Sequence, residues 1–481
     1  MRKIIFLISF LASLVIYAQD GSLDISFNVQ GQVSPETILK LQPDGKIILV
    51  ERFTGGGGFV ESTKINRLNP DGSYDLDFAS GIGVTVYPEV KMIALQSDGK
   101  IIICGNFDRL ENTVTGNLAA TGNLARLNQD GSLDTSFSKA PVRNIQTVVV
   151  QPDDKILIGG GFLRGIVRLY SNGDVDPFFR SPIDLSSFGI GGGSVLSNMV
   201  LLTDNRILAV GNVSIQGNVR RIFLMNSEGE LDSNFYEPEN IDWTNGDTWN
   251  PKFLTVEKTG NILIGWPFKV LSDTNDIIGY NFVRLDPNGN IMNVFQPHPY
   301  TDDCVLRVFP SALQDDGKII IRGSECFDYY GYDFRGIGRL NADGLFDDTF
   351  SPGTGTNDYV TDTAVQSDGR IILVGYFTEF NGMLVNNIIR LNSSRLSSSE
   401  FNNTDMRVYP NPVTDNLYIQ FPNNMNEIDI DELEVFDVTM KKIDFDGLNN
   451  DVIDVSDFSS GVYLLKVKTE NSIFTSKFVK R

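Results

Sequence analysis

The sequence is poor in the residues on which most nucleophilic and zinc sites are built, with one histidine and three cysteines in 481 residues. A Ser-His-Asp or Cys-His site would have to use His298, and no G-x-S-x-G elbow accompanies it. His298 stands between two prolines, so we interpret it as a residue of a rigid loop. Zinc sites of the familiar types need several His and Cys ligands. We therefore expect no catalytic constellation and no metal site of this kind.

Cysteine is also too scarce for a framework of disulfides. Cys104 lies inside the strand-like segment "IIICGNF" and is predicted to be a small buried hydrophobe. Cys304 and Cys326 flank one predicted strand pair and could form a disulfide in an oxidising compartment. Spacing in the sequence does not establish the geometry that such a bond needs.

Basic side chains are outnumbered, with 40 Lys and Arg against 61 Asp and Glu and a net charge of −21. Nucleic acid is therefore not an expected partner, because its phosphates need a basic surface. An acidic surface suits a solvated extracellular protein and could concentrate divalent cations.

Long apolar runs are missing except at the start of the chain. Arg2 and Lys3 precede the apolar run 4–16, and Ala18 follows it. This is the pattern of a secretory signal peptide over residues 1–18, with cleavage between Ala18 and Gln19. The run is too short for a stable anchor, and no second hydrophobic span follows. We expect an exported mature chain without an integral membrane segment.

Helical periodicity is missing too, whereas glycine is abundant at 45 residues, which indicates an all-β chain with many tight turns. Two short phrases alternate along it. The first, of the type "LQPDGKIILV", starts at intervals of 51 to 57 residues, at Leu41, Leu95, Val150, Leu201, Val256, Leu313 and Val365. The second, a turn followed by "SLDxSF", ends at Phe27, Phe78, Phe137, Phe179, Phe235, Phe295 and Phe350. Each phrase predicts an antiparallel hairpin, because Pro, Asp and Gly suit successive positions of a type I turn with a bulge.

Two hairpins in each repeat supply four strands, and seven such repeats are typical of a β-propeller, which we assign to residues 19–392. The first copy of the second phrase lacks its "RLN" head, and one head, Ile388–Ser394, lacks a tail. We expect these two halves to form one hairpin. That hairpin would close the ring and remove its open sheet edges.

The predicted hairpin register places the arginine of each head opposite the aspartate of its tail. The expected pairs are Arg67–Asp75, Arg126–Asp134, Arg168–Asp176, Arg339–Asp347 and, across the closing blade, Arg390–Asp24. Two repeats depart from the rule, with Leu224 opposite Asp232 and Arg284 opposite Met292. Opposite charges that face each other across a ladder contribute roughly 0.2–1 kcal/mol, so we expect the pairs to secure register more than stability.

These phrases resemble the delta-60 repeat, a family of bacterial β-propellers of mostly undefined function. The resemblance covers residues 20–392 and includes near-consensus copies such as "RLNQDGSLDTSF" from Arg126. It implies the propeller fold and brings no catalytic residues.

Residues 393–404 are rich in Ser and Asn and are predicted to be a linker. Beyond them the period stops, and apolar and polar residues alternate between turns in segments 406–421, 433–443 and 460–481. This alternation predicts a small β-sandwich. The expected fold is thus all-β, a seven-bladed β-propeller closed by its N- and C-terminal strands and followed by a small Ig-like β-sandwich.

The same terminal segments resemble the type A C-terminal sorting domain of the type IX secretion system. The matching residues are Tyr409, Pro410, Asn411, Pro412, Gly461, Tyr463, Lys477 and Lys480. For residues 405–481 the resemblance implies recognition by the type IX machinery and passage across the outer membrane of a Gram-negative cell. Removal of the tail would follow, with release or attachment to surface lipopolysaccharide.

Carboxylates are plentiful, but most lie in the repeat turns, where Asp is favoured for backbone reasons. The segment 69–75, "NPDGSYD", has some oxygen ligands of a calcium loop without the full spacing. Calcium is therefore an alternative to a plain turn, and we otherwise expect no cofactor. A hydrolase with two converging acids stays open, because acids converge only in three dimensions and no spacing singles out a pair.

Aromatic residues gather in loops expected on one face of consecutive blades, within segments 236–251, 296–300 and 326–334. The candidate ligand-binding residues are Trp243, Trp249, Tyr300, Tyr329, Tyr330, Tyr332 and Asp328. Aromatic faces beside polar acceptors suit sugars or peptides. The alternative is that the rings pack long loops onto the propeller.

Taken together, these patterns predict a secreted or cell-surface propeller that binds a glycan or a protein without catalysis. Two alternatives stay open. One is a secreted carbohydrate-active hydrolase or lyase that uses loop carboxylates, and the other is a structural component of the cell surface.

Overall fold

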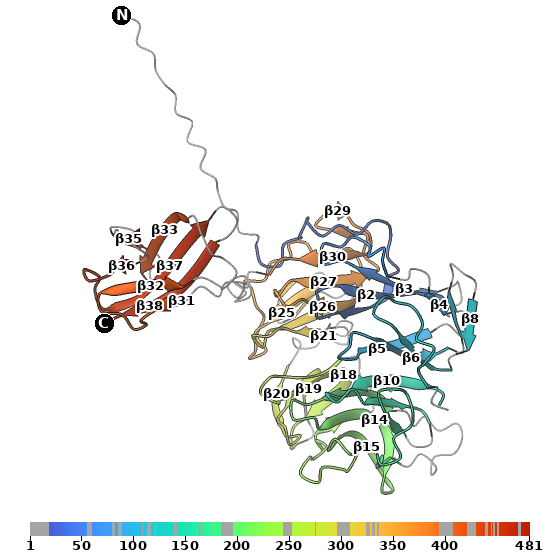
Figure 1. Ribbon diagram of the computed structural model, residues 1–481. Helices are drawn as coiled ribbons and strands as arrows, with labels where there is room; N and C mark the ends of the chain where they lie inside the picture. Colours follow the sequence, from blue (N-terminus) through green and yellow to red (C-terminus); the bar gives the residue numbers. More distant parts are fainter. Residues whose placement is uncertain are drawn as a thin grey trace, which may run out of the picture. The chain divides into compact units, whose positions relative to one another are not determined.

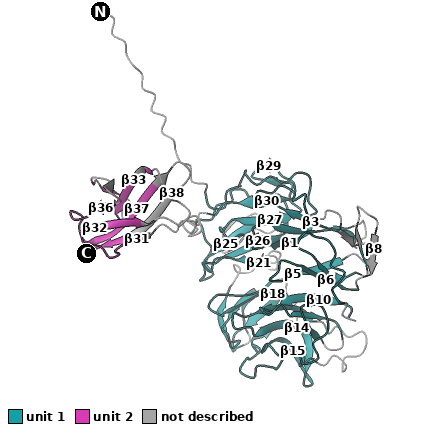
Figure 2. Ribbon diagram, viewed as in Figure 1, with its two compact units in different colours: residues 1–394 teal, residues 395–481 magenta. Residues whose placement is uncertain are grey.

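The computed structural model divides the chain into two compact units, residues 1–394 and residues 395–481 (Figure 2). The division falls inside the predicted linker. The predicted signal peptide and most of that linker lie outside the described residues. The structure describes residues 19–54, 60–78, 82–84, 89–107, 109–112, 117–120, 122–138, 142–162, 165–183, 196–243, 253–274, 276–295, 308–323, 328–329, 332–333, 336–393, 407–420, 430–437, 441–443, 445, 448–449, 452–469 and 473–481.

The first unit consists of antiparallel sheets, each with the same arrangement of three strands, that follow one another along the chain (Figure 1). In chain order they are β1 (Glu36–Leu41), β2 (Ile47–Thr54) and β3 (Val60–Leu68); β5 (Glu89–Leu95), β6 (Ile101–Asn106) and β9 (Leu124–Leu127); β10 (Ile145–Val150), β11 (Ile156–Gly160) and β12 (Ile166–Leu169); β13 (Leu196–Leu201), β14 (Ile207–Ile215) and β15 (Asn218–Met225); β17 (Phe253–Val256), β18 (Ile262–Leu271) and β19 (Ile277–Leu285); β21 (Val308–Leu313), β22 (Ile319–Gly323) and β25 (Ile337–Leu340); and β26 (Val360–Val365), β27 (Ile371–Gly375) and β30 (Ile388–Leu391).

Shorter strands extend or accompany these sheets. They are β4 (Ile82–Val84), β7 (Arg109–Asn112) and β8 (Asn117–Ala120), which continue the sheet of β3; β16 (Ile241–Asp242) and β20 (Ile291–Val294), which join β18 and β19; and the two-stranded pairs β23 (Asp328–Tyr329) with β24 (Tyr332–Asp333) and β28 (Glu379–Phe380) with β29 (Met383–Leu384).

The middle strand of each sheet begins with buried aliphatic residues, because sheets pack on both of its faces. Residues 47–50 of β2 and 101–104 of β6 have no accessible surface. Cys104 belongs to this core, as a small apolar residue would, and burial raises the pKa of its thiol. Cys304 and Cys326 lie outside the described residues. No helix among the described residues is long and apolar enough to cross a membrane.

The repeat turns have the predicted register. Asn128 N donates to Ser132 O at 2.7 Å, and Leu127 forms a bridge with Leu133. Gly131 closes the turn at a φ of 84°, which glycine adopts without strain.

The fourth strand expected in each repeat is shorter than the sequence predicts. In most repeats it is a single bridge, at Leu68–Tyr74, Leu127–Leu133, Leu169–Val175, Met225–Leu231 and Leu340–Phe346. The aspartate that follows ends the strand: Asp134 Oδ1 accepts hydrogen bonds from the N and Oγ of Ser136 at 3.0 and 2.5 Å, which turns the chain. Where Met292 replaces this aspartate, the strand continues as β20.

The two ends of the first unit complete one hairpin, as the unmatched repeat halves predict. Leu23 forms a bridge with Leu391, and Asp24 N donates to Arg390 O at 2.8 Å. The side chains also meet, because Arg390 Nε donates to Asp24 Oδ2 at 2.7 Å. Figure 1 shows the blue beginning of the unit beside the orange strand β30.

Contacts between successive sheets form a closed series. The phenylalanine that ends each repeat packs on the turn glycine of the next repeat, so closely that a Cβ there would lie 2.4 to 3.2 Å from a ring carbon. The pairs are Phe27–Gly72, Phe78–Gly131, Phe137–Gly173, Phe179–Gly229, Phe235–Gly289, Phe295–Gly344 and Phe350–Gly21. Because the last pair leads back to the first blade, the sheets surround an axis, and the first unit is a β-propeller.

The second unit is a β-sandwich. One sheet contains β31 (Arg407–Tyr409), β32 (Asn416–Gln420), β36 (Val452–Asp454) and β35 (Leu448–Asn449), and the other contains β34 (Lys442–Ile443), β33 (Ile430–Asp437), β37 (Gly461–Thr469) and β38 (Ile473–Lys480). Leu417 and Ile453 from the first sheet share a buried cluster with Leu465 and Phe478 from the second.

Candidate functional site

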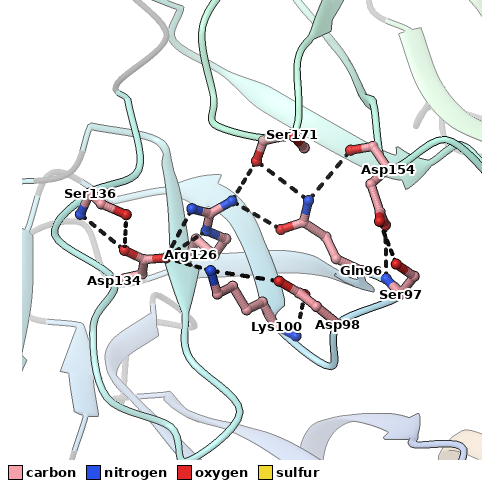
Figure 3. A network of polar contacts seen from close by, with 9 residues as sticks. All are labelled: Gln96, Ser97, Asp98, Lys100, Arg126, Asp134, Ser136, Asp154 and Ser171. Carbon is pink, nitrogen blue, oxygen red and sulfur yellow. Dashed lines mark hydrogen bonds and ion pairs between the residues drawn. The ribbon is translucent and has the colours of Figure 1, made fainter.

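The repeated arginines join each blade to the next through a polar network near the hairpin turns (Figure 3). Arg126 donates from Nε to Asp134 Oδ2 at 2.9 Å and from Nη1 to Gln96 Oε1 at 3.2 Å. Nη1 also donates to the carbonyl of Ser171, in the turn of the following repeat. The guanidinium lies 4.6 Å from the centroid of the Phe137 ring. These contacts occupy the arginine within the fold, so its role is structural.

The predicted head-to-tail pairs are all in contact. The Arg–Asp separations are 2.8 Å for Arg67–Asp75, 2.9 Å for Arg126–Asp134, 2.8 Å for Arg168–Asp176, 2.7 Å for Arg339–Asp347 and 2.7 Å for Arg390–Asp24. The pKa of Asp134 is lowered to about 2. Burial by itself would raise this pKa, but the hydrogen bonds from Ser136 and the charge of Arg126 outweigh it.

The two repeats that break the rule find other partners. Asp232, opposite Leu224, accepts a hydrogen bond from Arg206 Nη1 at 3.0 Å. Arg284, opposite Met292, donates to Glu257 Oε1 at 2.9 Å. Both partners belong to the first hairpin of the same repeat, which the sequence rule did not consider.

Acids of the repeat turns are engaged locally. In the segment 69–75, Asp71 Oδ1 accepts hydrogen bonds from the N and Oγ of Ser73 at 2.9 and 2.7 Å, and the hydroxyl bond is the main reason that its pKa is lowered. Over the described ranges, no group of three or more His, Cys, Asp or Glu residues is placed to hold a metal ion.

The predicted aromatic site is described only in part. Trp243 is half-buried and packs on the core around β18, with its ring edge-on to Phe268 at a centroid distance of 5.4 Å. In the backbone, Tyr329 pairs with Tyr332 and Asp328 with Asp333 across β23 and β24. Trp249, Tyr300 and Tyr330, with His298, lie outside the described residues. For Trp243 the structure shows packing, and the predicted set as a whole stays a prediction.

A different feature lies at the propeller axis. The first strands of successive sheets contact one another, from β5 through β10, β13, β17, β21 and β26 to β1. They border a cavity of about 580 Å³, which is lined by residues 38–40 of β1, 91–95 of β5, 148–150 of β10, 198–201 of β13 and Leu254 of β17. We call it the axial cavity. Its volume is within the range of small-molecule sites.

Two lysines and one asparagine are the polar side chains among the residues that line the axial cavity. Lys91 Nζ donates to Gln146 Oε1 at 2.8 Å and lies 3.6 Å from Glu89 Oε2. Burial lowers the pKa of Lys40, and the charge of Asp362 opposes that shift.

Asp362 lies at the bulge of β26, beside β1. Its Oδ2 accepts a hydrogen bond from Leu39 N at 2.9 Å and its Oδ1 one from Thr363 N at 2.9 Å. Burial raises the pKa of Asp362, against the effects of the Leu39 hydrogen bond and of the Arg322 charge. Arg322 Nη1 donates to Val360 O at 3.0 Å, whereas its buried Nε has no hydrogen-bond partner among the described residues.

These residues were not singled out from the sequence, although the repeat contains a signal. At the position of Lys40 the other repeats carry small or apolar residues, namely Ala94, Val149, Val200, Thr255, Ala312 and Ala364. At the position of Asp362 they carry Ile38, Met92, Thr147, Asn198, Phe253 and Pro310. A charge that breaks a repeat at one blade indicates a local role.

The sorting-motif residues of the second unit surround the last strand. Asn411 Oδ1 accepts a hydrogen bond from Val479 N at 2.9 Å, and the peptide bonds before Pro410 and Pro412 are cis. Tyr409 stacks on Tyr418 at a centroid distance of 5.5 Å.

The strand pair β37–β38 carries the rest of the motif. Gly461 pairs with Lys480 and Leu464 with Lys477. Tyr463 is buried, and its hydroxyl donates to Ser459 O at 2.8 Å. Lys480 Nζ donates to Arg481 O at 2.8 Å.

Two known families match the chain. Residues 407–481 match the secretion system C-terminal sorting domain, and residues 42–78, 96–137, 151–179 and 366–394 match the domain of unknown function (DUF5122) beta-propeller. Both resemblances drawn from the sequence are thereby confirmed. No curated protein matches the chain.

Solved structures with a similar fold include PorZ, described as an essential bacterial surface component of the type-IX secretion system of Porphyromonas gingivalis. It is 12% identical, with a TM-score of 0.44 over 94% of this chain and 60% of PorZ, so the chain spans 60% of that protein's length. A virginiamycin B lyase from Staphylococcus aureus is 13% identical, with a TM-score of 0.41 over 76% of this chain and 97% of the lyase. At these identities and scores neither likeness bears on function.

The terminal match decides the destination of the protein, because a type IX sorting domain marks a protein that is secreted or placed on the outer-membrane surface of a Bacteroidetes-type Gram-negative bacterium. The repeated segments show that the part of the chain before the sorting domain is a β-propeller. The chain thus contains β-propeller repeats of the DUF5122, delta-60-like type, followed by a type IX secretion C-terminal sorting domain.

Proposed function

We propose that the protein is a non-catalytic binding module, exported through the type IX machinery, that holds a glycan or protein ligand at the axial cavity of its propeller. The observation that supports this most directly is the cavity itself, about 580 Å³ in volume and bordered by the first strands of five sheets. Concave sites of this size with few polar groups are typical of ligand binding.

The construction of the propeller favours a preformed site. Each sheet is joined to the next by a Phe–Gly contact and, in several blades, by an arginine that reaches the following turn. Strand residues, rather than loops, form the cavity wall. A rigid wall lowers the entropic cost of binding, because little has to be ordered when the ligand enters.

The main alternative, a hydrolase or lyase, needs a carboxyl group that is free to exchange a proton. Asp362 has a raised pKa and would be the candidate near the axis. Each of its oxygens, however, already accepts a backbone hydrogen bond at 2.9 Å. This arrangement favours a fixed acceptor over a proton-transferring group, and hence binding over catalysis.

The proposal can be tested with the mature chain on an array of bacterial surface polysaccharides and extracellular proteins. A variant that fills the cavity, Val149→Phe, should lose binding. Leu384→Phe adds a ring on the exposed β28–β29 hairpin instead and should keep it. Thermal unfolding would verify that both variants are folded.

The outcomes separate the three functions. Retention of binding by Val149→Phe would contradict the axial site. Shortening of a polysaccharide by the wild type would favour the hydrolase or lyase. A wild type that binds nothing on the array would favour a structural role at the cell surface.

A further inference from the structure

Lys40 is a charged side chain without a described partner. It lines the axial cavity on β1, and it forms neither a hydrogen bond nor an ion pair with any residue in the described part of the chain. Among the described residues, Asp362 supplies the charge that acts on Lys40. A buried ammonium that is not paired is costly, because it loses hydration without gaining a compensating contact.

The charged groups around Lys40 are otherwise occupied. Asp362 is held by the backbone amides of Leu39 and Thr363. On β5, the first strand of the following sheet, Lys91 is held by Gln146 and lies near Glu89.

At the start of β1, Glu36 accepts a hydrogen bond from the Tyr376 hydroxyl at 2.7 Å. Arg52 Nε donates to the backbone carbonyl of Glu36 at 3.1 Å. Arg322 directs Nη1 to Val360 O. Asp362 and Glu36 thus accept hydrogen bonds from other groups and not from Lys40. The ammonium of Lys40 is therefore available to pair with an anionic ligand.

Apart from Lys40, Lys91 and Asn198, the residues of the cavity wall are apolar. Ile38, Met92, Ile93, Val149, Met199 and Leu254 are among its lining residues. A ligand that fills this space would gain most from an aliphatic body, because burial of apolar surface contributes roughly 25 cal/mol per Å². Sugar rings, whose hydroxyl groups need partners, fit such a wall less well.

The inner strand edges supply a second kind of recognition. β1 is an edge strand of its sheet, and the amide of Leu39 on that edge donates to a carboxylate, that of Asp362, at 2.9 Å. The edges of β5, β10 and β13 border the same cavity. Amides that point from an unpaired strand edge toward a cavity are suited to bind a carboxylate group.

From these features we infer that the axial cavity binds a ligand with a carboxylate on an aliphatic body, and that Lys40 recognises the carboxylate. The inference rests on the proposed function, since it names the chemistry of the ligand at the same cavity. The C-terminal end of an apolar peptide has this chemistry and would be a protein ligand of the kind proposed above. A fatty acid, which is neither glycan nor protein, shares it, and the experiment distinguishes the two.

Matched acids and amides test it directly. Titration calorimetry on the mature chain would compare octanoate with octanamide, and acetyl-Val-Leu with its C-terminal amide. Each pair differs in one charge and hardly at all in shape. At least one acid should bind about tenfold or more tightly than its amide, which corresponds to roughly 1.4 kcal/mol. The pair that shows the difference identifies the source as lipid or peptide.

Substitutions assign the effect to Lys40. Lys40→Met should reduce the affinity for the acid to that for the amide, and Lys40→Arg, which keeps the charge, should retain a preference for the acid. The matched control is Lys155→Met, because Lys155 lies on a repeat turn and pairs with Asp153 at 2.8 Å, away from the cavity. That variant should bind like the wild type. Unfolding curves would show that Lys40→Met is folded.

Two results would overturn the inference. One is equal binding of acid and amide, and the other is the absence of binding by all four probes at millimolar concentration. Failure here is distinct from failure of the proposed function: if Val149→Phe abolishes capture on the array while Lys40→Met does not, the axial site stands and the carboxylate chemistry falls.

Discussion

The closing hairpin gives the sharpest prediction about stability. We would replace Arg390 with methionine, which keeps an unbranched apolar stem and removes the guanidinium with its charge. In the folded protein Arg390 is buried and donates to Asp24 Oδ2 at 2.7 Å, to the carbonyl of Pro70 and to Gln366 Oε1 at 3.3 Å. Its guanidinium also lies 4.8 Å from the Phe27 ring centroid.

The expected loss follows from what is left behind. Removal of one partner of a buried ion pair typically costs about 3–5 kcal/mol, because the other charge stays buried and uncompensated. Arg370 Nε lies 3.8 Å from Asp24 Oδ2 and would supply part of the missing charge. We therefore expect a decrease of about 3 kcal/mol in the free energy of unfolding, at the lower end of that range.

Urea unfolding followed by tryptophan fluorescence would measure this change in the propeller, because every tryptophan of the chain lies within residues 243–266. Limited proteolysis adds a local measurement. Chymotrypsin should cut after Phe27 faster in Arg390→Met than in the wild type, since the segment at 20–27 is held by the closing hairpin.

Arg126→Met is the matched control. It removes the same kind of network from a hairpin whose strands are joined by a local turn. It should lower stability to a similar degree without exposing Phe27. A wild-type rate of cleavage after Phe27 in Arg390→Met, or a loss of stability below about 1 kcal/mol, would refute the reasoning.

Three further predictions concern the turns, the acids and the sorting domain. Gly131→Ala should lower the melting temperature well below that of Gly217→Ala, because both positions have a positive φ but only at Gly131 would the new Cβ meet a neighbour, Phe78 Cζ at 2.7 Å. Asp134 has a pKa lowered to about 2, so its pairing stabilises the fold above the ordinary Asp pKa of about 3.9 and is lost as the pH falls toward 2; Asp134→Asn should flatten the stability profile between about pH 4 and pH 2, and an unchanged slope would contradict the assignment. Asn411→Ala removes the acceptor of Val479 N and should destabilise the sorting domain by about 1 kcal/mol, measured by hydrogen exchange of the β38 amides.

The ring and its closing pair could be predicted because the spacing of residues within each repeat determines which of them pair. Arg126 and Asp134 stand at fixed positions of one hairpin, and the same spacing rule, applied to the two unmatched halves, places Arg390 beside Asp24. Turn chemistry and alternation are local properties, so a single sequence is enough to reveal them.

The exceptions could not be predicted in the same way. Asp232 pairs with Arg206 and Arg284 pairs with Glu257, each at the turn of the first hairpin of the same repeat, and a rule for the second hairpin does not include that turn. The shortened fourth strand has a similar cause. The β-propensity of its residues does not include the competing hydrogen bonds that the aspartate side chain accepts, which end the strand.

The axial site was missed for another reason. Lys40 and Asp362 lie on the first strands of the first and last blades, and they come together only because the ring closes. No spacing along the chain connects them. Comparison of each repeat with the others would have marked both residues as departures, without saying that they meet.

The closing hairpin also limits the order in which the propeller can fold. Asp24 emerges first during synthesis, and its partner Arg390 lies 366 residues later. Until that last strand has crossed the inner membrane, the leading segment has no sheet to join, and Lys40 has no Asp362 beside it. The binding site proposed here thus depends on closure of the ring, and a chain cut short before Arg390 would lack both the closing hairpin and the sorting domain that follows it.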